Sequence, residues 1–152
     1  GTVDAGTLAV NSRGTVLQVV NASYSTTASN STTTVANTGL TATLTPTSTT
    51  SKILVVVNQN GCYVSSGNAT NGLRLYLNRG ATVLFKVSES SGYTATLLRQ
   101  DPATISTSYL DSPATTAAVT YKTQFSNITG AASVEVQRSG TSSTMTLMEI
   151  AG

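Results

Sequence analysis

The side chains that could carry out chemistry are few in this sequence. It contains no histidine, so neither a Ser-His-Asp nor a Cys-His catalytic site can form. Ser-Lys chemistry would have to recruit Lys52, Lys86 or Lys122 from strand-like segments, and none of these lysines lies in a recognisable motif. We therefore expect a protein that is not an enzyme.

The carboxylates leave one catalytic alternative open. Glu135 and Glu149 lie on late strand-like segments, and paired carboxylates can cleave glycosidic bonds. A simpler interpretation is that each alternates out of an apolar face, where it meets solvent or pairs with Arg74, Arg99 or Arg138. A small glycan depolymerase is therefore the weakest of the functions considered.

No metal or cofactor site is predicted. Transition metals prefer His and Cys, and calcium prefers clustered carboxylates, whereas the six carboxylates of this chain are scattered. The alternative that several copies of the chain share an ion at a symmetry axis stays open. Cys62 has no second cysteine to pair with and no histidine to activate it, so we interpret it as a small buried apolar residue.

The sparse charge of the chain limits its partners. Charged residues make up 9% of the sequence and the net charge is +2, with the Lys and Arg residues spread singly. Phosphate binding draws on clustered Lys and Arg, so nucleic acid is not an expected partner. No apolar run approaches the roughly 18 residues that span a bilayer, so membrane insertion is not expected.

Short strand-like segments with turn residues between them indicate an all-β fold. Residues 16–22, 40–45 and 73–78 alternate between apolar and polar, which predicts half-buried antiparallel strands. The continuous apolar run Ile53–Val57 predicts a strand covered on both faces. A turn around Gly80 predicts that residues 73–77 pair with residues 83–87 in a hairpin.

Nine or ten strands are too many for one sheet with a wet face at this length. Besides the segments above, the strands are expected at residues 94–98, 118–125, 134–137 and 144–150, with a turn at 101–102. The prediction is a two-sheet antiparallel β-sandwich of jelly-roll topology. An immunoglobulin-like sandwich is the second choice, weakened by the absence of Trp and of a cysteine pair.

The chain is divided into two parts by its patterning. Residues 1–13 have weak periodicity and are interpreted as a linker or the end of a fibre stalk, and residues 14–152 as the jelly-roll head domain. The Ser/Thr/Asn-rich run 23–34 is interpreted as a long surface loop or an edge strand within that head, with no domain boundary.

Several segments, taken in order, resemble a domain found at the C-terminus of tail-fibre and other virion proteins of phages, notably marine ones. They are Gly14–Val20, Thr45–Val55, Tyr109–Thr116, Thr120–Phe125 and Met145–Ile150. The resemblance implies a homotrimeric head, similar in shape to tumour-necrosis-factor and complement-like heads. Such a head sits at the far end of a virion fibre or spike and acts outside the cell on a host surface.

The strands offer more apolar faces than a monomer of this size needs to bury, and no disulfide can stabilise the single chain. Both features also favour a homotrimer. We expect its inner sheet to contain the first strand, the 73–77 strand, the strand of Tyr121 and the C-terminal strand. The interface candidates are Leu75, Tyr121, Phe125 and Met148.

Host attachment through loops at the end distal to the stalk is the predicted function. The receptor-contact candidates are Tyr63, Tyr93 and Tyr109, because tyrosine combines a flat apolar face with a hydroxyl. The expected partner is a bacterial surface glycan or outer-membrane protein. An architectural cap that only trimerises the appendage is the alternative. The host, the receptor, the contacting loops and the kind of appendage stay open.

Overall fold

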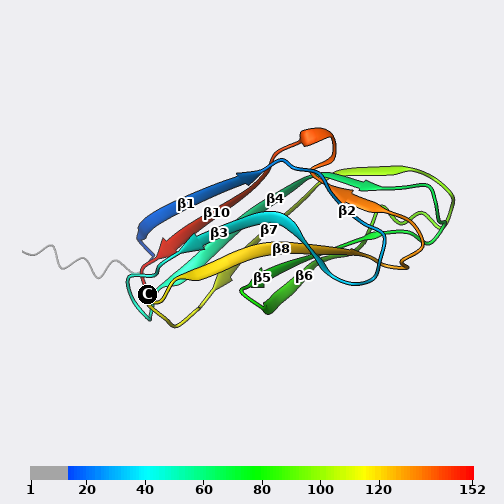
Figure 1. The fold of residues 1–152 in the computed structure, drawn as a ribbon. Helices are drawn as coiled ribbons and strands as arrows, with labels where there is room; N and C mark the ends of the chain where they lie inside the picture. The colour runs from blue at the N-terminus through cyan, green and yellow to red at the C-terminus, as the bar shows by residue number, and fades with distance from the viewer. Residues whose placement is uncertain (1–13) are drawn as a thin grey trace, which may run out of the picture.

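The computed structural model describes residues 14–152 as two antiparallel β-sheets stacked face to face (Figure 1). The proposed linker, residues 1–13, lies outside the described residues. No helix among residues 14–152 is long and apolar enough to cross a membrane. The elements are β1 (Val16–Tyr24), β2 (Ala28–Asn30), β3 (Ala36–Leu44), β4 (Lys52–Val64), β5 (Leu73–Arg79), β6 (Thr82–Ser91), β7 (Gln100–Asp111), β8 (Val119–Asn127), β9 (Val134–Val136), the 3-10 turn η1 (Arg138–Gly140) and β10 (Ser143–Ile150).

The strands pair as a single long hairpin that has been rolled up. β1 pairs with β10, β3 with β8, β4 with β7, and β5 with β6, all antiparallel. The six-stranded sheet has the order β1-β10-β4-β9-β2 with β7 also paired to β4, and the four-stranded sheet has the order β3-β8-β5-β6. This nesting is the jelly-roll topology predicted from the sequence, and it excludes the immunoglobulin-like alternative.

The core between the sheets has two apolar clusters. One is built around Ile53, Tyr121 and Leu147, and the other around Cys62 and Phe125. Both clusters consist of inward-pointing side chains, because side chains along a strand point alternately into the sandwich and out of it. Cys62 is buried as predicted. Desolvation by burial raises the pKa of its thiol to about 12, and the Ile105 backbone, which lowers the pKa, offsets only part of this effect.

A layer of polar side chains separates the two clusters and links the sheets. Gln59 donates to the hydroxyl of Ser143 at 3.0 Å and accepts from the hydroxyl of Thr123 at 2.8 Å. The Thr123 hydroxyl also lies 2.6 Å from that of Thr38. Because each of these buried groups has a partner, the layer fixes the register of the two sheets without an unpaired polar atom along this path.

Several sequence predictions match these elements. The 73–77 and 83–87 segments form the predicted hairpin, with Leu77 opposite Phe85. The run 23–34 contains the short strand β2, which is the edge strand paired with β9.

Two predictions for the second half of the chain are wrong. Residues 94–98 form a loop, and the strand follows later, as β7 (Gln100–Asp111). The dipeptide 101–102, expected as a turn, lies inside this strand. Proline is tolerated there because β7 is paired on one side only, with β4, and its other edge needs no backbone N–H.

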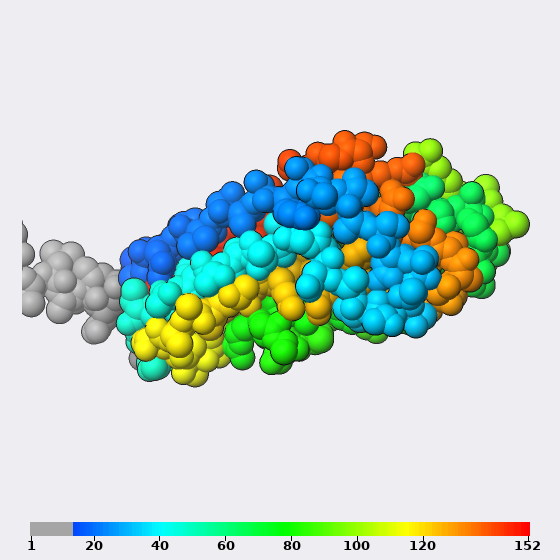
Figure 2. All heavy atoms as spheres, in the orientation of Figure 1, coloured from blue at the N-terminus to red at the C-terminus, as the bar shows by residue number. Residues whose placement is uncertain are grey.

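The sandwich has distinct ends, which we call the base and the tip. At the base, the N–H of Gly14 donates to the carbonyl of Ala151 at 2.9 Å, so both ends of the described chain lie together (Figure 1). The tip, at the opposite end of the long axis, is built from loops 65–72, 92–99 and 128–133, in green, light green and orange in Figure 2.

Candidate functional site

The outer face of the six-stranded sheet, turned away from the four-stranded sheet, carries an apolar row. Val19 lies opposite Met148, Met148 opposite Leu54, and Leu54 opposite Leu110, so the four side chains cross β1, β10, β4 and β7 in line. Val19 is 57% exposed and Leu110 is 49% exposed, whereas Met148 and Leu54 are half-buried. This apolar row is uncovered in the single chain.

The strand Ile53–Val57 was expected to be covered on both faces, and only one face is. Ile53, Val55 and Val57 are fully buried in the core. Leu54 and Val56 are half-buried on the outer face. The residues that give the run its unbroken apolar character are therefore those on the uncovered side, where a second protein surface would complete the burial.

Toward the tip, the outer face becomes polar but stays uncharged. The next row across the sheet is Asn21, Thr146, Val56 and Ser108, and the one after it is Ser23, Thr144, Asn58 and Ser106. Their side chains bond to one another across the strands, as between Asn21 and Thr146 at 2.9 Å and between Ser106 and Asn58 at 2.7 Å. These rows offer no charge that another chain would have to pair.

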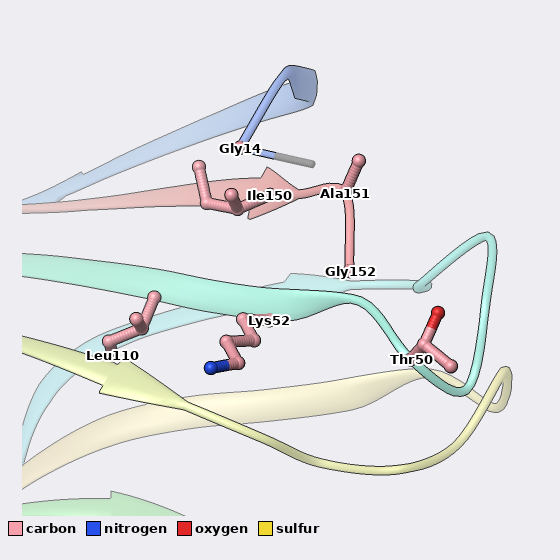
Figure 3. A pocket seen from close by; sticks show the side chains of 7 residues that line it. All are labelled: Gly14, Thr50, Lys52, Leu110, Ile150, Ala151 and Gly152. Carbon is pink, nitrogen blue, oxygen red and sulfur yellow. The ribbon is translucent and has the colours of Figure 1, made fainter. Parts of the chain in front are cut away.

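A hollow of about 560 Å³ opens at the base, next to the apolar row. Leu110 from β7 and Ile150 from β10 stand on its sides, with Lys52 of β4 between the strands (Figure 3). Gly14, Thr50, Ala151 and Gly152 complete the lining. The hollow therefore lies where the described chain begins and ends.

Three of the four predicted interface residues are wrong. Leu75, Tyr121 and Phe125 are completely buried in the core of their own chain, so no second chain can touch them. The predicted inner sheet is also wrong, because β1 and β10 belong to the six-stranded sheet and β5 and β8 to the four-stranded sheet. Alternation alone cannot tell which sheet an amphipathic strand joins. Met148 does lie on an outer face.

Tyr121 bonds across the sandwich. Its hydroxyl donates to Oδ2 of Asp111 at 2.7 Å. The same carboxylate oxygen also accepts a hydrogen bond from Arg79 at 2.7 Å. Burial raises the pKa of Tyr121 well above its usual range, and the bond to Asp111 adds to the shift. The residue therefore ties the two sheets together near the base.

Of the three predicted receptor-contact tyrosines, only Tyr93 lies in a tip loop. It shares loop 92–99 with Leu97 and Leu98, which the sequence analysis missed by assigning them to a strand. The signal that could have found them is the adjacent pair itself. Two large apolar side chains in a row place one of them on the wrong face of any alternating strand.

The other two tyrosines are strand residues. Tyr109 lies on β7 in the base half of the molecule and packs on Phe85, with ring centroids 5.1 Å apart. Tyr63 lies on the outer face of β4 near the tip, where the Arg138 guanidinium covers its ring at 3.5 Å from the centroid. One face of the Tyr63 ring is therefore not free to stack on a sugar.

Charged residues gather around Tyr63. Arg99 pairs with Asp101 at 3.0 Å, and Arg138 approaches Glu135 at 3.6 Å and Asp101 at 3.7 Å. The pairing of Glu135 with Arg138 was one of the outcomes expected for this carboxylate. We call Tyr63 and these four charged residues the Arg–Tyr cluster; its positive and negative charges balance.

Glu149 has a structural environment, contrary to the expectation that it meets solvent. Its side chain is fully buried and accepts hydrogen bonds from Gln18 at 2.6 Å and from the N–H and hydroxyl of Thr47, each at 2.7 Å. Burial acts to raise the pKa of the carboxyl, but the hydrogen bonds from Gln18 and Thr47 outweigh it and hold the pKa at about 2. Glu149 therefore ties the β3–β4 loop to β1.

The structure does not bring Glu135 and Glu149 together. Glu149 lies opposite Ile53 and Glu135 opposite Tyr63, so they are ten positions apart along β4, or roughly 30 Å at the usual strand rise. Glycosidase carboxylates lie within about 10 Å of each other. Within residues 14–152, no three Cys, Asp or Glu side chains gather as a metal site would need.

Comparison with known proteins identifies the fold and leaves the family open. No family model matches the sequence, and no curated protein matches it. Among solved structures, VP2 of infectious bursal disease virus, crystallised as a subviral particle, is similar with a TM-score of 0.53 and 10% sequence identity. The match covers 88% of this chain and 32% of VP2, so the chain spans about a third of that protein. At this identity the shared feature is the antiparallel β-sandwich.

Proposed function

We propose that this chain is the head of a virion appendage of tail-fibre type, which attaches the particle to a host-cell surface through its tip. The proposal draws on the fold it shares with VP2 of a virus particle and on the resemblance of its sequence to phage fibre heads. The head acts as three copies, outside the cell.

The observation that carries the proposal is the polarity of the molecule along its long axis. The described chain enters and leaves at the base, where Gly14 bonds to Ala151. The loops 65–72, 92–99 and 128–133 lie at the tip (Figures 1 and 2). A module held at one end and presenting loops at the other suits the terminal position of an appendage.

The outer face of the six-stranded sheet is the surface through which the copies join. The apolar row of Val19, Met148, Leu54 and Leu110 is continuous, and exposed apolar side chains contribute about 1.5–3 kcal/mol each when fully buried. The rows on its tip side are neutral, and the row on its base side carries one charge, that of Lys52. The number of copies, three, follows the resemblance to fibre heads.

Competition for adsorption tests this function. The purified chain, added to cells that the parent virus infects, is expected to bind them and to lower the rate at which virions adsorb. A chain that forms its oligomer but neither binds these cells nor slows adsorption contradicts the attachment function.

An architectural cap is the second candidate, and the apolar row favours it, because that row serves assembly whether or not the tip touches a receptor. A virus with Tyr93→Ser, Leu97→Ser and Leu98→Ser in this chain separates the two functions. Loss of adsorption with intact particles supports attachment, whereas full infectivity supports the cap.

A further inference from the structure

The tip loop, residues 92–99, is unusually apolar for the surface of this molecule. Leu97 is 66% exposed, Leu98 is 56% exposed and Tyr93 is 46% exposed. Leu97 is the most exposed large apolar side chain in residues 14–152. Single exposed apolar residues are ordinary, but three in one short loop form a patch that gains free energy when a partner covers it.

The threonine side chains of the tip loop are bonded within the loop itself. The hydroxyl of Thr94 donates to the carbonyl of Thr96 at 3.1 Å, and the hydroxyl of Thr96 donates to that of Thr94 at 3.2 Å. The N–H of Leu98 donates to the same carbonyl of Thr96 at 2.8 Å. The two threonine hydroxyls are therefore engaged within the loop, and its exposed side chains are the apolar Leu97 and Leu98, with Tyr93 and Arg99 beside them in the sequence.

The backbone holds this shape at a cost. Ala95, between the two threonines, has φ 57, in the left-handed region that side chains other than glycine avoid by roughly 1 kcal/mol. Strained residues of this kind persist where the surrounding structure fixes them and are concentrated at binding sites.

The other two tip loops, 65–72 and 128–133, contain no charged residue. Gly92 lies against Val64, which leads into loop 65–72, and the N–H of Ser65 donates to the carbonyl of Ser133 in loop 128–133 at 3.0 Å. Asn68 is bonded within its own loop, to Thr70. Arg99, at the end of the tip loop, is paired with Asp101.

We propose that the tip loop binds a protein receptor, inserting Leu97 and Leu98, flanked by Tyr93, into an uncharged apolar pocket. This inference rests on the proposed attachment function and names the class of partner. An apolar centre with a neutral polar rim, here loops 65–72 and 128–133, is the usual anatomy of a protein–protein contact. An anionic glycan or lipid surface would call for unpaired Lys or Arg at the tip.

Cell-binding measurements test this partner class. The labelled full chain is compared with the variant Leu97→Ser/Leu98→Ser on cells that the parent virus infects, with Val83→Ser as the control, since Val83 is 53% exposed on β6, near the base. We expect at least a tenfold loss of binding for the double variant and none for Val83→Ser. Ala95→Gly, which relieves the backbone strain, should bind within about threefold of the unmodified chain.

Treating the cells identifies the partner. Protease treatment should abolish binding, whereas periodate oxidation of surface sugars should leave it unchanged, and vesicles of lipid extracted from the same cells should not bind the chain. Loss on periodate treatment but not on protease treatment, binding to the lipid vesicles, or unchanged binding by a correctly folded double variant each overturns the proposal. If the unmodified chain does not bind the cells at all, it is the attachment function that fails.

Discussion

Met148 on β10 lies directly opposite Leu54 on β4, on the face of the six-stranded sheet that the sandwich itself leaves uncovered. This pair is the centre of the apolar row. In the proposed assembly, a charge placed there would be buried without a partner. Met148→Glu is therefore expected to convert the oligomer to monomer while the fold is kept, as measured by light scattering and circular dichroism.

Thr43→Glu is the matched control for Met148→Glu. Thr43 is exposed on the outer face of the four-stranded sheet, where its hydroxyl lies 2.8 Å from that of Thr120. The Thr43→Glu variant carries the same new charge on the opposite side of the sandwich, so we expect its oligomer to persist. If the Thr43 variant dissociates and the Met148 variant does not, the copies join through the other sheet.

Glu149 makes the stability of the chain depend on pH. Its carboxyl has a pKa of about 2 in the folded chain, against an ordinary value of 4.5. The stabilisation is fully present above about pH 4.5 and is lost as the pH falls toward 2, which amounts to about 3 kcal/mol. Glu149→Gln should lower the free energy of unfolding by a similar amount at pH 7 and flatten its pH dependence between pH 5 and 2.

Glu89→Gln is the control for this pH dependence, with urea unfolding at one protein concentration as the measurement. The pKa of Glu89 is also lowered, first by its hydrogen bond from Lys86 and then by that from Arg74, but the carboxylate is exposed to solvent. Solvent screens such a pair, so its removal should change stability little. Equal pH profiles for Glu149→Gln and the unmodified chain would mean that the Glu149 hydrogen bonds contribute nothing.

The polar layer in the core should be sensitive to a single hydroxyl. Thr123→Val keeps the side-chain shape but leaves the Gln59 carbonyl oxygen without its 2.8 Å donor. An unsatisfied buried acceptor costs about 1–3 kcal/mol. Thr120→Val, on the outward side of the same strand, should cost less than about 0.5 kcal/mol. Denaturant midpoints compare the two, and an equal loss would show that the buried layer has no special importance.

The ring of Tyr24 leaves no room for a side chain at Gly39 on β3. A methyl group at this position, where φ is +93, would overlap the tyrosine ring. Gly39→Ala is therefore expected to destabilise the fold more than Gly80→Ala, which has φ +56 and nothing within 4 Å of the added carbon. The second substitution should cost about 1 kcal/mol, as expected for the backbone alone. Adding Tyr24→Ala should restore part of the loss caused by Gly39→Ala, but not that caused by Gly80→Ala.

The sequence predicts the fold class because each strand carries a local signal. Alternation marks β1, β3 and β5, and the residues around Gly80 mark the β5–β6 hairpin. β7 has a weaker signal, since Thr104, Ser106 and Ser108 occupy outward positions before Leu110 and Pro102 lies inside it. Its place at an edge tolerates both features, and an edge position depends on the assembled sheet.

The candidate surfaces are harder to predict because burial depends on which sheet a strand joins. Tyr121 and Phe125 alternate as Met148 does, yet they point into the core while Met148 points out of it. Leu97 and Leu98 break the alternation of a strand, which the sequence analysis did not weigh, and the three-dimensional structure places them in an exposed loop. Period-two patterning separates two faces of a strand, but it does not say which of them is covered.

The mass of the purified chain in solution is the most direct test of the central claim, that the head works as three copies joined through the outer face of the six-stranded sheet. Light scattering at micromolar concentration should give three times the chain mass of 15.5 kDa. A mass of 15.5 kDa would contradict the claim.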